Sequence, residues 1–135
     1  PTHQDNAPDT FAGYCARILQ RYRSMQPRAR FFLMTMVHSG DAGFDAMVDQ
    51  HAALLHDLAG MLENTYVLDF AKYAPVYDVE FRRQFYLGGH MNPAGYLLTA
   101  RMVAAYVDFI IRHHMEDFAQ VGFIGTELYH RDAKW

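Results

Sequence analysis

Two short apolar runs separated by an amphipathic stretch occupy the middle of this chain. The first run, residues 30–37, is nearly all apolar and does not alternate, and the second run is residues 65–70. Such runs are typical of strands that are covered on both faces, as in a parallel sheet. Between them, residues 44–62 place apolar side chains at helical spacing. The pattern predicts a strand–helix–strand unit and therefore an α/β fold.

Three further helices are predicted around this unit. Residues 11–25 repeat apolar side chains every three or four positions, which predicts one buried face with Cys15 on it as a small core residue. A short helix is expected at residues 79–85, within an otherwise irregular, aromatic-rich loop at residues 71–86. The long helix at residues 93–114 is apolar around so much of its girth that it needs more than one packing partner.

Length and composition fit a single domain, 1–135, with a lead-in at residues 1–8 and a tail at residues 116–135. The net charge is −3 and no face is rich in lysine, so nucleic acid is not an expected partner. The single cysteine excludes an internal disulfide and, with no secretory signal in the sequence, favours the cytoplasm. Arg101 and Asp108 interrupt the longest apolar run, so no membrane span is expected.

One histidine, His90, follows two glycines and precedes the predicted long helix. Gly88 and Gly89 can adopt the backbone angles of a tight crossing. Asn92 is a favourable N-cap and Pro93 suits the first helical position, so His90 lies just ahead of a helix N-terminus. The partial positive charge there disfavours imidazolium and keeps the ring able to accept a proton. His90 is thus a candidate general base, and the alternative is a loop histidine that bonds the backbone.

Residues 85–96, Phe-Tyr-Leu-Gly-Gly-His-Met-Asn-Pro-Ala-Gly-Tyr, resemble the last conserved block of the SGNH (GDSL) hydrolases. That block usually reads Asp-x-x-His-x-Asn-x-x-Gly, and its histidine is the general base. His90, Asn92 and Gly95 match the block, whereas Leu87 stands where the family has its aspartate. The resemblance covers most of the chain, but only the C-terminal half of the family's pattern.

The resemblance implies a serine esterase or deacylase with a three-layer α/β/α, flavodoxin-like parallel sheet that is incomplete in this chain. The implied substrate is an ester of an acetyl or short acyl group, on carbohydrate among others, and no cofactor is expected. The family's nucleophilic serine belongs to an earlier block, which neither Ser24 nor Ser39 matches. With Leu87 in place of the acid, the carboxylate that would orient the base is left open among Asp69, Asp78 and Glu80.

A non-catalytic role is the alternative interpretation. The chain would then have kept the hydrolase scaffold, lost the active site, and served as a binding or assembly module. Leu87 and the missing serine motivate this alternative.

Ligands of open α/β sheets bind beyond the carboxyl ends of the strands. The loops that carry His38, Asp69 and His90 are all expected there, so these residues should lie near one rim. His90 is the candidate catalytic residue, and His38, Asp69 and Asn92 are candidates for binding substrate or orienting the base.

No metal site is expected from the histidines. His51 and His56 are five residues apart, a spacing that a helix does not place on one face. The chain has neither a His-x-x-x-His nor a Cys-x-x-Cys spacing.

Two strands and three main helices cannot close a doubly wound sheet. One strand edge and part of the long helix should therefore stay uncovered. Apart from an ester substrate, the expected partner is a second copy of the chain or a missing N-terminal half.

Overall fold

The computed structural model describes residues 10–118 and 126–127. Within them the chain is mixed α/β and mostly helical, and the elements follow one another in this order: α1 Phe11–Met25, β1 Phe31–Met34, α2 Ala42–Met61, β2 Thr65–Leu68, α3 Phe70–Tyr73, α4 Val79–Phe85, β3 Tyr86–Leu87, β4 His90–Met91 and α5 Pro93–His113.

The two apolar runs pair as parallel strands, as predicted. Phe31 is aligned with Thr65 and Met34 with Leu68. Both strands are shorter than expected, because β2 ends where Asp69 becomes the N-cap of α3, and β1 has no strand partner beyond Leu68. The strand–helix–strand unit is confirmed, with α2 as its helix.

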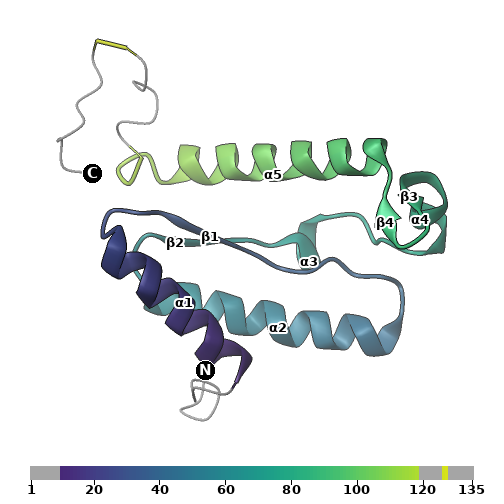
Figure 1. The fold of residues 1–135 in the computed structure, drawn as a ribbon, viewed down its shortest axis with the longest axis horizontal. Coiled ribbons are helices and arrows are strands. Elements are labelled where there is room, and N and C mark those ends of the chain that lie inside the picture. The colour runs from purple at the N-terminus through teal and green to yellow at the C-terminus, as the bar shows by residue number, and fades with distance from the viewer. Residues whose placement is uncertain (1–9, 119–125, 128–135) are drawn as a thin grey trace.

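Helices lie on both sides of this small sheet (Figure 1). Helix α5 runs along one side, and α1 and α2 lie on the other. The side chains at the centre come from the sheet, from α3, from the C-terminal part of α5 and from the segment after it: Leu68, Phe70, Ile110 and Phe118. Because Phe118 is buried in this cluster, the region predicted as a tail from residue 116 contributes to the core.

Capping chemistry sets where the long helices begin. The Asp41 carboxylate accepts a hydrogen bond from the Phe44 amide, so α2 starts two residues before the predicted position 44. Asn92 caps α5 by accepting from the Gly95 amide, and Pro93 takes the first helical position, as predicted.

The apolar stripe of α1 is not buried in the way its spacing predicts. Leu19 is buried, but Tyr14, Ile18 and Tyr22 expose 51%, 56% and 56% of their surface. Helix α1 packs against α2, but these side chains stay exposed, so the expectation of one buried face is wrong for the described residues. Cys15 is partly buried, and that burial raises the pKa of its thiol.

The predicted loop at residues 71–86 contains more structure than expected. Its start is the short helix α3, and α4 occupies residues Val79–Phe85 as predicted. The glycine-rich segment that follows is a β-hairpin rather than an irregular loop. The expectations for residues 1–8 and for the tail beyond Phe118 fall largely outside the described residues.

The length and apolar composition of helix α5 set it apart from the other helices described. Among the described residues it alone is long and apolar enough to cross a membrane by length and composition. Core helices of soluble proteins pass the same test, so the property by itself is weak evidence of a span.

Candidate functional site

His90 lies in a hairpin of two-residue strands between α4 and α5. Tyr86 is aligned with Met91, and Leu87 with His90. Gly88 makes the turn with a φ of +62°, a conformation that favours glycine. The hairpin therefore places His90 two residues ahead of Asn92, the N-cap of α5.

Asn92 joins the hairpin to both neighbouring helices. Its backbone amide donates to the Phe85 carbonyl at 2.8 Å, and its side-chain amide donates to the Gln84 carbonyl at 2.8 Å. Its side-chain oxygen accepts from the Gly95 amide at 2.9 Å. Both polar ends of the Asn92 side chain are thus used within the fold, so the structure gives it a positioning role.

Gly95 lets α5 approach the end of α4 closely. A Cβ atom at this position would lie 2.5 Å from the Phe85 carbonyl oxygen, which is far inside van der Waals contact. The glycine of the resemblance therefore has a steric explanation in this structure. Together, Asn92 and Gly95 fix the direction in which the hairpin leaves α4.

The His90 side chain is exposed, and within residues 10–118 and 126–127 no hydrogen bond to its ring is formed. Tyr86 and Met91 line a pocket beside the carboxyl end of β1. Neighbouring aligned pairs of a hairpin present their side chains to opposite faces, so Leu87 and His90 face away from that pocket. Leu87 is accordingly 71% exposed.

None of the three candidate carboxylates contacts His90 among the described residues. Asp78 caps α4 by accepting from the Phe81 amide, and Glu80 accepts from Arg83 and Gln84 on the same helix. Asp69 is bonded to His56 and to the Lys72 amide.

His38 and Asp69 do meet at the carboxyl ends of β1 and β2, as predicted, whereas His90 is not among the residues that line the cavity they share. Both line a cavity of about 430 Å³ together with Asp49, Ala52, Ala71 and Lys72. His38 is paired with Asp49, with 2.8 Å between Nε2 and Oδ1. His56 is paired with Asp69, with 2.8 Å between Nε2 and Oδ2.

Asp69 is the most constrained residue of this rim. It is 8% exposed, accepts from the Lys72 amide through Oδ1, and holds His56 through Oδ2. His56 and Asp49 were not predicted from the sequence as partners of Asp69 and His38. Both partners lie on α2, and the packing of this helix alongside β2 is a contact between distant segments that has no local sequence signal.

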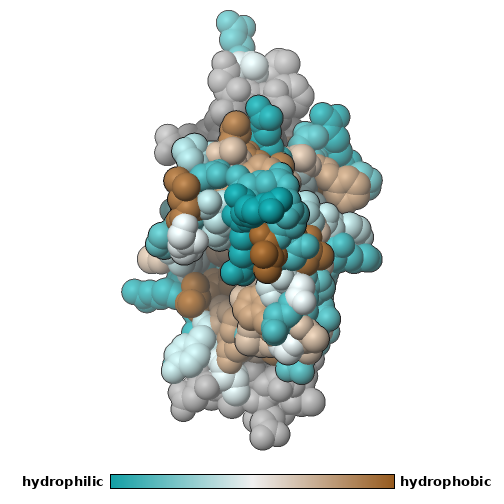
Figure 2. Space-filling view, turned by 90° about the vertical axis from the view of Figure 1, so that its right-hand side faces the viewer, coloured by the Kyte–Doolittle hydropathy of each residue, from teal (hydrophilic) through white to brown (hydrophobic). Residues whose placement is uncertain are grey.

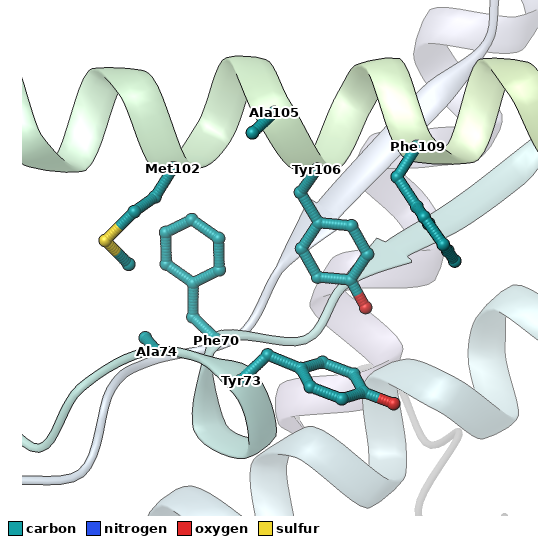
Figure 3. Close-up of a pocket in the computed structure, with 7 residues that line it drawn as sticks. All are labelled: Phe70, Tyr73, Ala74, Met102, Ala105, Tyr106 and Phe109. Carbon is teal, nitrogen blue, oxygen red and sulfur yellow. The ribbon is translucent and has the colours of Figure 1, made fainter.

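An apolar pocket of about 460 Å³ lies between α3 and α5 (Figure 3). Its walls are almost entirely apolar or aromatic, with the rings of Phe70, Tyr73, Tyr106 and Phe109 turned toward the space. Burial is the main cause that raises the pKa of Tyr106, so its phenol stays neutral. The pocket offers packing surface and no group for acid–base chemistry near neutral pH.

One group of side chains in the described part of the chain could hold a metal ion. The ligand atoms of His114, Glu116 and Asp117 lie within 4.8 Å of one another just after α5. Asp117 already accepts a 2.5 Å hydrogen bond from the Tyr66 hydroxyl, and burial together with this bond raises the pKa of Tyr66. One carboxylate oxygen is therefore already committed to the sheet.

In comparisons with protein-family models, with curated proteins and with solved structures, nothing matches this chain.

Proposed function

We propose that this chain carries the general base of an SGNH-type serine esterase, and that the base is His90. The observation that carries the proposal is the state of its ring, which is exposed and has no hydrogen bond to the described residues. A general base needs a free ring nitrogen within reach of the proton that it abstracts. The resemblance of residues 85–96 to the last SGNH block adds the family assignment.

In the proposed reaction, the nucleophilic serine comes from a segment outside these 135 residues. His90 takes the proton of that serine hydroxyl as the oxygen attacks the acyl carbon, and then protonates the leaving alcohol. Both serines of this chain have other partners: Ser24 donates to the Arg21 carbonyl, and Ser39 donates to the Asp45 carboxylate. This supports a nucleophile from elsewhere, acting on an ester of an acetyl or short acyl group.

The proposal includes a larger, flavodoxin-like sheet with helices in layers on both faces. The amides of Phe31 and Thr35 donate to the carbonyls of Asn64 and Leu68, on the β2 side. Backbone groups alternate in direction along a strand, so those of Phe32 and Met34 point to the opposite edge of β1, whereas those of Leu33 face β2. A further parallel strand can pair at that edge and bring the serine-bearing segment with it.

Replacing His90 in the full-length protein tests the proposal. His90→Ala is expected to lower turnover of a small aryl ester by at least about 100-fold, the lower end of a general-base contribution. His38→Ala and His56→Ala are matched controls, because these histidines are already paired with carboxylates, and both should keep most of the activity. Circular dichroism checks that each variant is folded. Unchanged turnover in His90→Ala would overturn the proposal.

A binding or assembly module is the second candidate, favoured by the exposed apolar stripe on α1. It predicts that the full-length protein hydrolyses no ester and that His90→Ala leaves its association unchanged. Both candidates predict that this chain by itself associates, with another copy or with a missing half, because exposed apolar surface of this kind seeks a partner. Light scattering of the isolated chain that showed a stable monomer would contradict both.

A further inference from the structure

The pocket at the carboxyl end of β1 differs from the apolar pocket between α3 and α5 because a charged side chain, Arg82, lines it. It measures about 320 Å³, at the lower end of the range for small-molecule sites. It is formed by the segment after β1, by α4, by the inner face of the hairpin and by α5. Figure 2 looks onto the end of the molecule that carries α4 and the hairpin, where hydrophilic and hydrophobic residues lie side by side.

Most walls of this pocket are apolar, and its hydroxyl groups already have partners. Thr35 Oγ1 accepts from the Ala71 amide at 2.8 Å. The Tyr77 hydroxyl and Thr99 Oγ1 share a hydrogen bond of 3.0 Å. Ser39 Oγ donates to Asp45, and His38 Nε2 pairs with Asp49. These groups stabilise the pocket, and their known bonds reduce what they can offer a ligand.

Among the polar residues of the pocket, Arg82 differs because part of its hydrogen-bonding capacity is unused. Its Nε donates to the Tyr77 carbonyl at 3.0 Å, and its guanidinium carbon lies 5.7 Å from the centre of the Tyr86 ring. These two contacts orient the side chain. Within the described residues no carboxylate forms an ion pair with Arg82, although its neighbour Arg83 pairs with Glu80 at 2.8 Å. The two outer nitrogens of Arg82 are therefore available.

We propose that this pocket binds a small organic anion through Arg82. The ligand would carry a carboxylate or phosphate group on a short apolar body. A guanidinium that is already oriented presents a planar pair of donors, which matches the two oxygens of such a group. The apolar walls, which include Met36, Val37, Phe70 and Met91, suit the body of the ligand.

This binding site is separate from the proposed base. Tyr86 and Met91 face the pocket, whereas His90 lies on the other face of the hairpin. Binding therefore requires neither His90 nor a serine supplied from elsewhere. A negative result in the esterase assay leaves this inference intact, and the reverse also holds.

Calorimetric titration of the chain at pH 7 tests the inference with four probes. Phenylacetate and phenyl phosphate carry an anion and an apolar body, phenylacetamide lacks the charge, and inorganic phosphate lacks the body. We expect the first two to bind and the other two to bind at least about tenfold more weakly, because each lacks one of the two recognised features. The tighter of the first two probes identifies the preferred head group.

Two neighbouring arginines provide a matched pair of variants. Arg82→Gln should weaken phenylacetate and phenyl phosphate by about tenfold or more, whereas Arg83→Gln should bind as the unaltered chain does. Arg82→Lys keeps the charge but loses the planar pair of donors, so it should fall between them. Circular dichroism of all three variants checks the fold, and the lysine variant keeps the test valid if glutamine disturbs the bond to Tyr77.

Amide chemical shifts locate the bound probe. Addition of phenylacetate should shift the amides of Met36, Met91 and Thr99, which line the pocket, more than those of α1. The inference is overturned if neither anionic probe binds, if Arg82→Gln and Arg83→Gln have equal effects, or if the shifts gather elsewhere.

Discussion

The histidines at the rim and the histidine of the hairpin are held in opposite ways. In both His38 and His56, one ring nitrogen is paired with a carboxylate oxygen at 2.8 Å. His90 has no such bond among the described residues, and its position is set by the backbone on either side of it. The two pairs join α2 to the segments that follow β1 and β2, whereas both ring nitrogens of His90 lack a partner among the described residues.

This difference shows that a position at the end of a parallel sheet does not by itself make a histidine reactive. The rim was the predicted place for His38, Asp69 and His90 together, and the first two are tied into the fold there. His90 itself is not bonded in this way, but its neighbours are. Asn92 and Gly95 fix the joint between α4, the hairpin and α5, from which the His90 ring projects.

The joint beside His90 gives the largest expected effect. Gly95→Ala forces a Cβ to within 2.5 Å of the Phe85 carbonyl oxygen, so we expect a loss of about 3 kcal/mol in the free energy of unfolding. Gly60→Ala is the control, because nothing lies within 4 Å of a Cβ there, and it should stabilise α2 by about 0.5 kcal/mol. Urea unfolding of both variants at equal concentration measures the difference. Equal effects would mean that the joint is not close-packed.

The rim gives the next effect. Asp69→Ala removes the cap of α3 and the partner of His56 from a site that is 8% exposed, which should cost about 2 kcal/mol of unfolding free energy. Asp49→Ala breaks the other pair, but its side chain is 66% exposed, so the loss should stay below about 0.5 kcal/mol. Denaturant midpoints decide between them, and similar losses would show that the two rim pairs are equivalent.

The smallest effect concerns the acid stability of the loop beside His38. The Ser39 backbone amide, aided by the Gly40 amide and the Ser39 hydroxyl, lowers the pKa of Asp45 below its ordinary value. A lowered carboxyl pKa stabilises the fold above the unfolded-state pKa, and that contribution disappears as the pH falls through the folded-state value. Asp45→Asn should therefore lose less stability on acidification below about pH 4 than the unaltered chain. Identical acid transitions of the two proteins, followed by circular dichroism, would argue against this.

Elements with local signals were predictable from the sequence. The bounds of α1 and α4 and the start of α5 depend on capping residues and helical spacing within a few positions, and the structure has them where expected. The parallel pairing of β1 and β2 followed from their apolar character and the helix between them.

Features that depend on contacts between distant segments were not predictable. The spacing of α1 gives one apolar side but does not say whether anything covers it, and Tyr14 and Ile18 are exposed. The bond between His56 and Asp69 joins residues 13 apart through the packing of α2 on β2. The pocket around Arg82 is lined by residues of several elements between β1 and α5, none of which carries a local motif for it.

The parallel pairing of Phe31 with Thr65 also bears on how the chain folds. The two strands are separated in sequence by the whole of α2, so their hydrogen bonds form only when this long segment closes into a loop. The chain therefore loses the entropy of loop closure before the sheet contributes any stabilisation. We expect α2 to become helical early and to bring the two strand segments into reach of each other. Folding speed should then respond to the helicity of α2 more than to the side chains of the strands.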